Sequence, residues 1–204
     1  KLLSMSHAKV IGVSKGEYEE ALKLTKNAMY INNGIDITKI PKGGKKEFDR
    51  EHPVICTLGR ISFPKNPSMF NRIAESFPEW KFIWIGDGDL RSELTASNIE
   101  ITGWMDREEA TEQLARADVF LIPSLWEGLP VALMEAMAAG LPSVSSRIRG
   151  NVDLISDGIE GKLVEPMDIR GYAQAVMELE RQPSVREKLI ANSKRKIQQF
   201  SIEY

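Results

Sequence analysis

The chain has 204 residues, 42% of them hydrophobic, which is enough for one sizeable hydrophobic core or one core with a partial second. Its 27 Lys and Arg against 29 Asp and Glu leave a formal charge of -2, so no overall electrostatic argument favours nucleic acid or a membrane as the partner. A single cysteine, Cys56, excludes an intramolecular disulfide framework, and its apolar surroundings favour a buried thiol in a reducing, cytoplasmic setting.

Short apolar runs alternate with amphipathic segments along nearly the whole chain. The runs predict strands at residues 9–13, 28–31, 54–58, 81–85, 99–102, 119–122, 142–145 and 162–164. Helices are expected at residues 68–77, 90–96, 107–117 (with Asp106 as N-cap) and 130–139. Repeated strand, helix, strand order implies parallel strands with right-handed crossovers. The pattern from about Asn33 onward therefore predicts an α/β fold with a doubly wound, Rossmann-like parallel sheet and ligands at the carboxyl ends of its strands.

Two further segments lie outside this alternation of strands and helices. Residues 34–53 are polar and rich in Gly, Pro and charge, which is typical of a linker. The lysines and glycines at 42–46 faintly resemble a phosphate loop, but the G-x-x-x-x-G-K-[ST] spacing is absent and a solvated loop is the favoured interpretation. At the C-terminal end, residues 168–199 predict two helices broken at Pro183.

The stretch 119–146 is apolar except for two carboxylates, Glu127 and Glu135. A buried ionised carboxylate is costly unless it is hydrogen-bonded or paired, so both need donors from elsewhere in the protein or from a ligand. The stretch is long enough to cross a membrane, but prolines and glycines divide it into pieces of strand and helix length. We therefore interpret it as part of a folded core with two polar positions.

The tripeptide Gly-Leu-Pro occurs at both ends of the helix expected at 130–139. Gly128-Leu129-Pro130 places a proline at the first helical position, and residues 140–142 end the helix with a glycine and a later proline. Glu127 then lies in the loop before the helix and Glu135 in its second turn. Free N–H groups at residues 131–133 would face the same side as Glu127 and attract phosphate. This arrangement suits a sugar, a diphosphate and a ribose.

At this point the motifs resemble a known family. Glu127-x7-Glu135, within PSLWEGLPVALMEAMAAGLPSV, resembles the signature of the retaining glycosyltransferases of the glycosyl transferase group 1 type, family 4, which have the two-domain GT-B fold. Further matching pieces occur in the family's order: YINNGID (30–36), LGR (58–60) with KN (65–66), IGDG (85–88), TG (102–103) and GKLVEP (161–166). The segment RGNVDLI (149–155) departs from the family's common Gly-Gly-x-x-Glu form and looks more like transferases of bacterial capsule and exopolysaccharide assembly.

The resemblance implies a role for each charged residue of these motifs. Glu127 would face the donor sugar and Glu135 would bond the ribose hydroxyls of the nucleotide, with buried structural glutamates as the alternative. Arg60 and Lys65 match the basic pair that holds the donor diphosphate, and cations of this kind stabilise a leaving group that gains charge. Surface charges on a strand-to-helix loop are the alternative for this pair.

Further donor contacts follow from the same resemblance. Gly86, Asp87 and Gly88 follow a strand, where glycine lets a backbone approach a ligand closely; a plain tight turn is the alternative. Trp104 and Met105 are candidates for the nucleobase pocket, and Trp104 could equally be a packing aromatic. The helix start contributes Gly128, Leu129, Pro130 and Val131. No metal site and no cofactor are expected, because the two histidines, His7 and His52, stand far apart and no metal-ligand cluster is apparent.

The resemblance also predicts how the chain is divided and what its partners are. Residues 1–32 match the end of an N-terminal acceptor domain, and residues 33–204 match the C-terminal, donor-binding half of a GT-B enzyme. We expect the chain to be a fragment that transfers little or nothing alone. The expected partners are a nucleotide-sugar donor, with UDP-sugar favoured, and a glycan or lipid-linked acceptor held by the missing domain.

The resemblance also implies a location and leaves two competing functions open. A cytoplasmic location follows, with contact to the inner membrane face through the basic stretch 188–196 as one option and a solvated helix face as the favoured one. Two alternative functions are an epimerase-like GT-B enzyme, which would need additional acid/base carboxylates, and a nucleotide-binding module without catalysis. The presence of Glu127, Arg60 and Lys65 argues against the second.

Overall fold

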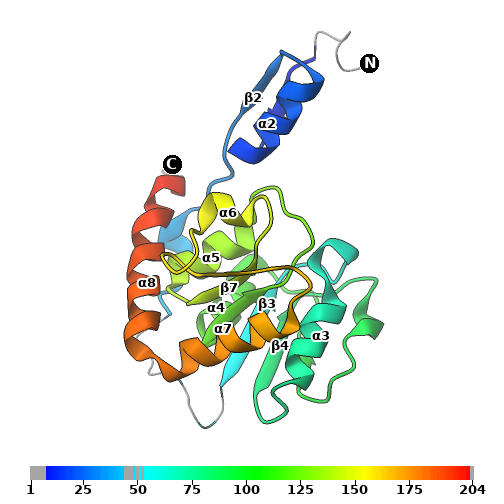
Figure 1. The fold of residues 1–204 in the computed structure, drawn as a ribbon, viewed down its shortest axis with the longest axis vertical. Helices are drawn as coiled ribbons and strands as arrows, with labels where there is room; N and C mark the ends of the chain where they lie inside the picture. Colours follow the sequence, from blue (N-terminus) through cyan, green and yellow to red (C-terminus); the bar gives the residue numbers. More distant parts are fainter. Residues whose placement is uncertain (1–7, 44–47, 49–50, 52, 203–204) are drawn as a thin grey trace.

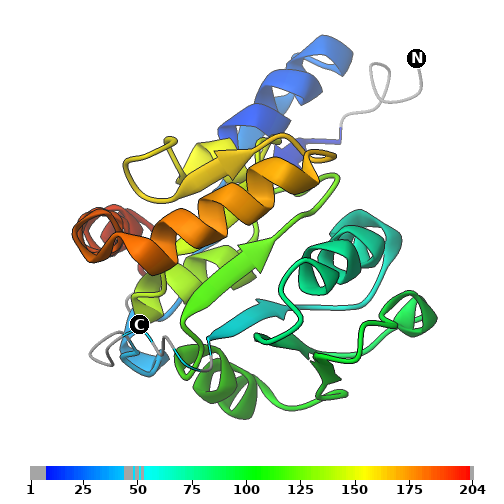
Figure 2. The same ribbon diagram turned by 60° about the horizontal axis from the view of Figure 1, so that its bottom comes forward.

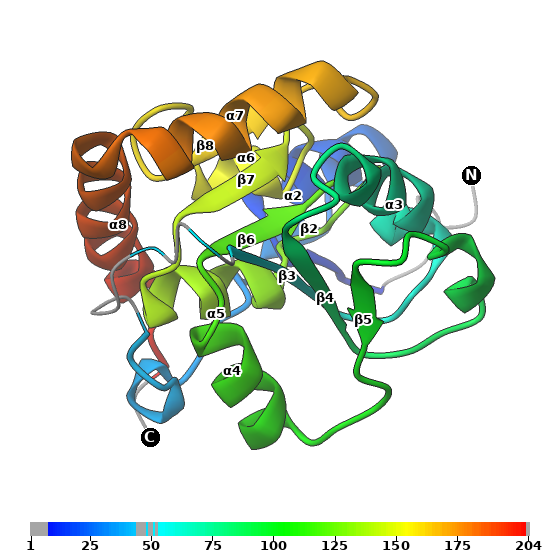
Figure 3. The ribbon, with the colours of Figure 1, turned by 90° about the horizontal axis from the view of Figure 1, so that it is seen from below.

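The computed structural model describes residues 8–43, 48, 51 and 53–202. Its main feature is a sheet of six parallel strands in the order β5-β4-β3-β6-β7-β8 (Figure 3). The strands are β3 (Val54–Leu58), β4 (Lys81–Ile85), β5 (Ile99–Ile101), β6 (Val119–Ile122), β7 (Ser143–Ser146) and β8 (Lys162–Val164). Counted along the chain this is the order 3-2-1-4-5-6 of doubly wound nucleotide-binding sheets. The predicted fold class is confirmed.

Helices cover both faces of this sheet, because its strands are apolar on both sides. Cys56 and Phe120 point into one core with α4 (Arg107–Ala115) and α5 (Val131–Ala139). Their chain neighbours Ile55 and Leu121 point into a second core with α3 (Pro67–Glu75) and α7 (Ile169–Arg181). Figure 2 shows α7 lying across the sheet, and α8 (Pro183–Ile197) follows it and packs on α5. The predicted break at Pro183 is confirmed, with Pro183 as the first residue of α8.

A small separate unit precedes this domain. The strands β1 (Val10–Gly12) and β2 (Ala28–Tyr30) form a parallel two-stranded sheet joined through α2 (Lys15–Leu24), and the unit stands apart from the main sheet (Figure 1). We did not predict α2. Its start has the S-x-x-E sequence of a capping box: Ser14 Oγ accepts from Glu17 N at 3.2 Å, and the Glu17 carboxylate accepts from Val13 N, one residue before the cap, at 2.8 Å. The domain boundary near residue 33 stays a prediction.

One predicted helix is wrong. Residues 90–96 form only a short 3-10 turn, η3 (Arg91–Glu93). The N–H groups of Thr95 and Ala96 donate instead to the Asn71 side-chain oxygen on α3, at 2.7 and 2.8 Å. A side chain from another element thus replaces the carbonyls that a helix would supply.

The helix boundaries near the glutamates need one correction. Asp106 is confirmed as the N-cap of α4, because its Oδ1 accepts from Glu109 N at 2.9 Å. Pro130, by contrast, is the N-cap residue of α5 and not its first helical residue. Gly140, with φ of 82°, ends α5 as predicted.

The segment 34–53 is not simply a solvated linker. It contains a 3-10 turn, η1 (Ile37–Lys39), and its side chains Ile35, Ile40 and Phe48 are buried. The Arg186 guanidinium lies over the Phe48 ring, 4.8 Å from its centroid. Apolar side chains in a polar segment therefore attach it to the domain. The lysines at 45 and 46 lie outside the described residues, as do His7 and His52.

Candidate functional site

The strand order reverses between β3 and β6, and in doubly wound sheets ligands bind outside the carboxyl ends of the strands at such a point. The loop after β3 carries Arg60 and Lys65, and the loop after β6 carries Glu127. The parallel register pairs Cys56 with Phe120, so the two loops leave the sheet at the same level. Residues far apart in the sequence therefore meet at this switch point.

Lys65 and Glu127 form an ion pair between these two loops. Lys65 Nζ lies 2.7 Å from Glu127 Oε1, with the two side chains 22% and 11% exposed. Ser124 Oγ donates to the same oxygen at 2.7 Å. The second oxygen of Glu127 accepts no hydrogen bond from any described residue. One oxygen of this carboxylate is thus held in place while the other is available to a donor.

Backbone and side-chain bonds fix the two loops to each other. Leu125 N donates to Pro64 O at 2.8 Å, and Asn66 Nδ2 donates to Pro123 O at 3.1 Å. Asn66 itself has φ of 54°, a left-handed conformation that asparagine tolerates better than most residues. The short turn η2 (Phe63–Lys65) before it places Lys65 toward Glu127.

An aromatic pair lies on the same two loops. The rings of Phe63 and Trp126 meet edge to face with centroids 5.5 Å apart, and both side chains are more than half exposed. Such a pair packs favourably even at the surface. It adds an apolar contact between the loops beside Lys65 and Glu127.

Ser124 was not predicted as a site residue. It is fully buried, and its carbonyl oxygen accepts from Ser146 Oγ at 2.6 Å. Asn151, in the short helix α6 (Asn151–Leu154), donates in turn to Ser146 Oγ at 3.1 Å. A buried series of hydrogen bonds from Asn151 through Ser146 thus holds Ser124, the residue that binds Glu127. A serine three residues before a glutamate is too common a pattern to have indicated this.

Arg60 does not contact Glu127. Its Nη2 lies 2.6 Å from Asp89 Oδ2, and both side chains are largely exposed. Arg60 therefore bridges the loops after β3 and β4. Its predicted contact with a diphosphate would require the side chain to exchange this exposed partner, and exposed ion pairs of this kind are weak.

The predicted glycine loop after β4 is built around close backbone contacts. Gly86 has φ of 132°, and a Cβ added there would overlap the Gly59 carbonyl oxygen. Gly86 N donates to Thr102 Oγ1 at 3.1 Å, and Asp87 Oδ1 accepts from Gly88 N at 2.8 Å. The packing of neighbouring loops explains why glycine is needed. Contact of these residues with a ligand stays a prediction.

Glu135 is the more deeply buried of the two glutamates, with a side chain that is 6% exposed. Its Oε1 accepts from Arg107 Nε at 3.0 Å, and Arg107 Nη2 lies 2.9 Å from the same oxygen. Burial raises the pKa of Glu135, and the Arg107 guanidinium acts in the opposite direction. Arg107 was predicted only as the start of a helix. A cation at the positive end of a helix is unfavourable, and this was the feature of the sequence that could have indicated a special role for Arg107.

The remaining predicted residues differ in exposure. Trp104 is 71% exposed, so it is not a core aromatic, whereas Met105 packs against the core. Leu129 is buried, so its side chain serves packing. Val131 is partly exposed at the start of α5, whose first intrahelical bond runs from Met134 N to Pro130 O at 3.2 Å. The N–H groups of residues 131–133 therefore have no intrahelical acceptor, as predicted.

The small N-terminal unit approaches the loop that carries Glu127. A Cβ at Gly128 would lie 2.7 Å from Glu17 Oε1, so glycine allows this close approach. Arg149, in the loop after β7, pairs with Glu20 of α2 at 2.8 Å. The start of α2 is thus held against the loops at the carboxyl edge of the main sheet.

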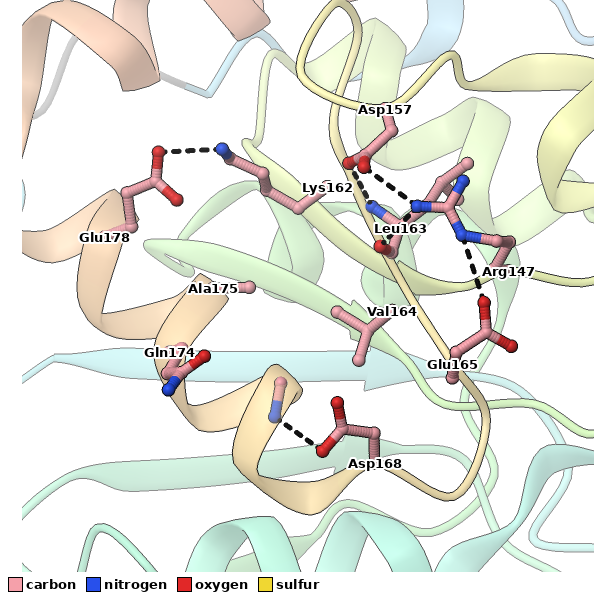
Figure 4. A pocket seen from close by; sticks show the side chains of 11 residues that line it. Arg147, Asp157, Lys162, Leu163, Val164, Glu165, Asp168, Gln174, Ala175 and Glu178 are labelled. Carbon is pink, nitrogen blue, oxygen red and sulfur yellow. Dashed lines mark hydrogen bonds and ion pairs between the residues drawn. The ribbon is translucent and has the colours of Figure 1, made fainter.

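A separate pocket of about 340 Å³ lies between β8 and α7 (Figure 4). Its charged groups pair with one another: Arg147 Nη2 lies 2.8 Å from Asp157 Oδ2 and Lys162 Nζ 2.7 Å from Glu178 Oε1. Asp168 caps α7 through Gly171 N at 2.9 Å. None of the predicted site residues lines this pocket, and its charges are satisfied internally.

The described part of the chain contains neither a group of metal-ligand side chains nor a helix suited to span a membrane. No three His, Cys, Asp or Glu side chains within it are grouped so as to hold a metal ion. None of its helices combines the length and hydrophobicity needed to cross a bilayer.

Comparison with known proteins identifies the family. The family described as glycosyl transferases group 1 matches residues 52–182, which include β3 to β8 and the loops described above. The chain belongs to this family. The resemblance drawn from the motifs is therefore confirmed.

Individual relatives agree with this assignment. The Escherichia coli UDP-Gal:alpha-D-GlcNAc-diphosphoundecaprenol alpha-1,3-galactosyltransferase is 35% identical over 170 residues, covering 72% of this chain and 43% of the relative. The chain spans less than half the length of the first curated relatives that it matches.

Solved structures agree on the fold. Sucrose-phosphate synthase from Thermosynechococcus elongatus superposes with a TM-score of 0.83 at 20% identity, covering 98% of this chain and 55% of that one. Anabaena HepE, solved in complex with UDP and glucose, gives 0.83 at 17% identity, covering 98% and 61%. Both are GT-B glycosyltransferases, so the sheet described here corresponds to half of a GT-B fold.

Proposed function

We propose that this chain is the donor-binding part of a retaining glycosyltransferase that uses a nucleotide-diphosphate sugar. The observation that carries the proposal is the Lys65–Glu127 ion pair of 2.7 Å at the switch point of the sheet, in the loop that leads into α5 and its free N–H groups. Few functions need a cation, a carboxylate and an anion-binding helix end together. A glycosyl diphosphate has the matching groups: two phosphates and a ring of hydroxyls.

Each part of the donor then has a partner in the site. The diphosphate lies at the amino end of α5 and near Lys65, where both the N–H groups and the ammonium stabilise negative charge. A sugar hydroxyl donates to the free oxygen of Glu127, and ribose hydroxyls donate to Glu135. Arg60 turns from Asp89 toward the phosphates.

The reaction breaks the bond between the anomeric carbon and the phosphate oxygen and forms a bond from that carbon to the acceptor oxygen, on the same face. The acceptor hydroxyl releases its proton to solvent, and the nucleoside diphosphate leaves with the electron pair of the broken bond and so with an added negative charge. Lys65 and the helix N–H groups stabilise that charge as it develops. In this proposal no resident metal or cofactor is required, because protein cations hold the diphosphate.

Relatives support the choice of donor and pathway. The E. coli relative is named for UDP-galactose and a diphosphoundecaprenol acceptor, and the Anabaena structure contains UDP and glucose. We therefore favour a UDP-sugar donor and a glycan or lipid-linked acceptor in bacterial surface polysaccharide or glycolipid synthesis. The acceptor is held by a further domain, so the chain alone transfers little. We also propose that the reaction takes place in the cytoplasm.

Calorimetric titration with UDP, GDP and ADP tests the nucleotide assignment. We expect UDP to bind, and Glu135→Ala to weaken UDP binding by about tenfold or more, because a charge-assisted hydrogen bond is worth about 1.5–3 kcal/mol. Glu178→Ala, which removes a carboxylate from the separate pocket, is the matched control and should leave the affinity unchanged. The proposal fails if none of the three nucleotides binds at millimolar concentration.

The role of Glu127 is tested by comparing UDP with UDP-glucose and UDP-galactose. We expect Glu127→Ala to remove most of the additional affinity that the preferred sugar provides and to change UDP affinity little. Equal losses for UDP and the UDP-sugars would instead indicate a structural role for Glu127.

A further inference from the structure

Glu135 is held by a residue that none of the motifs includes. α5 carries no other charged side chain, and the partner of Glu135 comes from the start of α4. Arg107 directs both Nε and Nη2 at the single oxygen Oε1, at 3.0 and 2.9 Å. No hydrogen bond from the described residues reaches Oε2. The carboxylate therefore has one occupied and one available oxygen.

This arrangement does little for the stability of the fold. The Glu135 side chain is 6% exposed while that of Arg107 is 62% exposed, so the carboxylate is desolvated and its partner remains in water. Desolvation of the carboxylate offsets much of such a pair's attraction, and a cation at a helix start opposes the helix dipole. An uncharged residue at position 135 would pack into α5 without these costs. The pair therefore needs an explanation beyond stability.

The elements packed against α5 differ in the charges that they bring to Glu135. Strands β6 and β7, which pack against α5, carry no ionisable side chain, and α8 brings Lys194 next to Gly140 at the far end of α5. On α4, Arg107 is the charge that lowers the pKa of Glu135 against the effect of burial. Arg107 thus favours the ionised form of this carboxylate.

We propose that Arg107 is a positioning residue for the nucleotide: it fixes Glu135 through Oε1 and leaves Oε2 as the acceptor for the ribose hydroxyls. The inference rests on the proposed function, because it assigns a second residue to the same nucleotide site. In this proposal the ion pair between Arg107 and Glu135 remains intact while Glu135 accepts hydrogen bonds from the ribose. Arg107 also lies two residues after Met105 and three after Trp104, which places it close in the chain to the predicted base loop.

The test compares UDP with 2′,3′-dideoxy-UDP, which lacks the ribose hydroxyls. In the wild-type chain we expect UDP to bind about tenfold or more tightly than the dideoxy nucleotide, because the lost bonds involve a charged acceptor. In Arg107→Ala this ratio should fall toward unity, mainly through weaker UDP binding, while the affinity for dideoxy-UDP changes little. Arg107→Lys keeps the charge without the two-pronged contact and should give an intermediate ratio.

The pH dependence separates positioning from a general structural effect. Without Arg107 the pKa of Glu135 rises further, so the ratio in Arg107→Ala should recover as pH is raised and Glu135 ionises. In the wild type Arg107 lowers the pKa of Glu135, so the affinity ratio should reach its full value at a lower pH than in Arg107→Ala. Arg116→Ala removes an exposed arginine at the other end of α4 and should change neither the ratio nor its pH profile.

The outcomes distinguish the two proposals. If the wild type binds neither nucleotide, the proposed function and this inference both fail. If it binds UDP but Arg107→Ala weakens both nucleotides equally, Arg107 acts on the base or the phosphates and the positioning role is wrong. An unchanged ratio in Arg107→Ala also overturns it. Should Arg107→Ala not fold, as judged by circular dichroism, a wild-type ratio and pH profile in Arg107→Lys and Arg107→Gln would overturn it.

Discussion

Each carboxylate of the apolar stretch obtains its cation from another element of the chain. Glu127 is paired with Lys65 from the loop after β3, and Glu135 with Arg107, the first residue of α4. In both cases the cation contacts Oε1 and the second oxygen receives no hydrogen bond from the described residues. The protein thus holds both groups in place without using up their ability to accept.

At the scale of the residue we predict that Glu135→Gln does not destabilise the protein near neutral pH. Burial raises the pKa of Glu135 above its ordinary value of 4.5, so the folded protein binds the proton more tightly than the unfolded chain. The wild type therefore loses stability relative to the variant as pH rises through the raised pKa, and the two converge below about pH 4.5.

Urea denaturation at several pH values measures this difference. Glu112→Gln, on the exposed side of α4, serves as the control and should show no comparable pH dependence. A Glu135→Gln variant that is less stable than the wild type at neutral pH would show that the ion pair contributes to folding. The same variant should bind UDP weakly, as expected where a functional group is kept at the expense of stability.

The sequence predicted the acidic residues of the site better than their partners. Glu127 and Glu135 were recognisable because a charge in an apolar stretch is an anomaly in the chain itself. Arg107 and Ser124 were missed, because Arg107 lies in an ordinary charged segment and Ser124 follows a strand as many serines do. Their importance depends on which loops meet, and this is a property of the tertiary structure.

Elements of the sheet were easier to predict than the helices beside them. Mostly apolar runs define β3, β4, β6 and β8 with the predicted bounds, because a short apolar run between helices has few alternatives to a strand of a parallel sheet. The helix expected at 90–96 failed because Asn71, a residue on another helix, binds the N–H groups of that segment. The conformation of such a short segment depends on contacts with other elements, and hydrophobic periodicity gives no information about those contacts.

At the scale of the element we predict that Gly86→Ala is strongly destabilising. The backbone there has φ of 132°, which strains an L-residue, and the added Cβ would overlap the Gly59 carbonyl oxygen, which also accepts from Trp84 Nε1 at 2.8 Å. Strain and overpacking together should cost about 2–5 kcal/mol.

Gly158→Ala provides the matched control for this prediction. Its φ of 72° also strains an L-residue, but an added Cβ would meet nothing within 4 Å. The cost should be about 1–2 kcal/mol, from conformation alone. Urea midpoints of the two variants measure the difference, and equal losses would show that the contact between the loops after β3 and β4 is not tight.

The molecule as a whole is one doubly wound sheet with a core on each face and its candidate site at the reversal of strand order. The parallel, doubly wound sheet, with ligands expected at the carboxyl ends of its strands, followed from the alternation of strands and helices. The small unit formed by β1, α2 and β2 did not, because α2 is short and its capping box was overlooked.

At the scale of the whole molecule we predict that the Cys56 thiol reacts only when the domain unfolds. Cys56 is fully buried on β3, the strand beside the switch point, and burial raises its pKa far above the range in which thiolate forms. Labelling with iodoacetamide should therefore be slow, should not accelerate at about pH 9, and should become rapid in concentrated urea. Fast labelling of the native protein would mean that β3 opens locally.

The ion pair between Lys65 and Glu127 also limits how this protein can evolve. The two residues come from loops 62 positions apart, and each neutralises a largely buried charge on the other. Substitution of one alone leaves its partner charged and unpaired, which is more harmful than loss of both. Proteins that descend from this one should therefore keep both residues or replace both. Substitutions at positions 65 and 127 should be correlated, although the two codons are far apart in the gene.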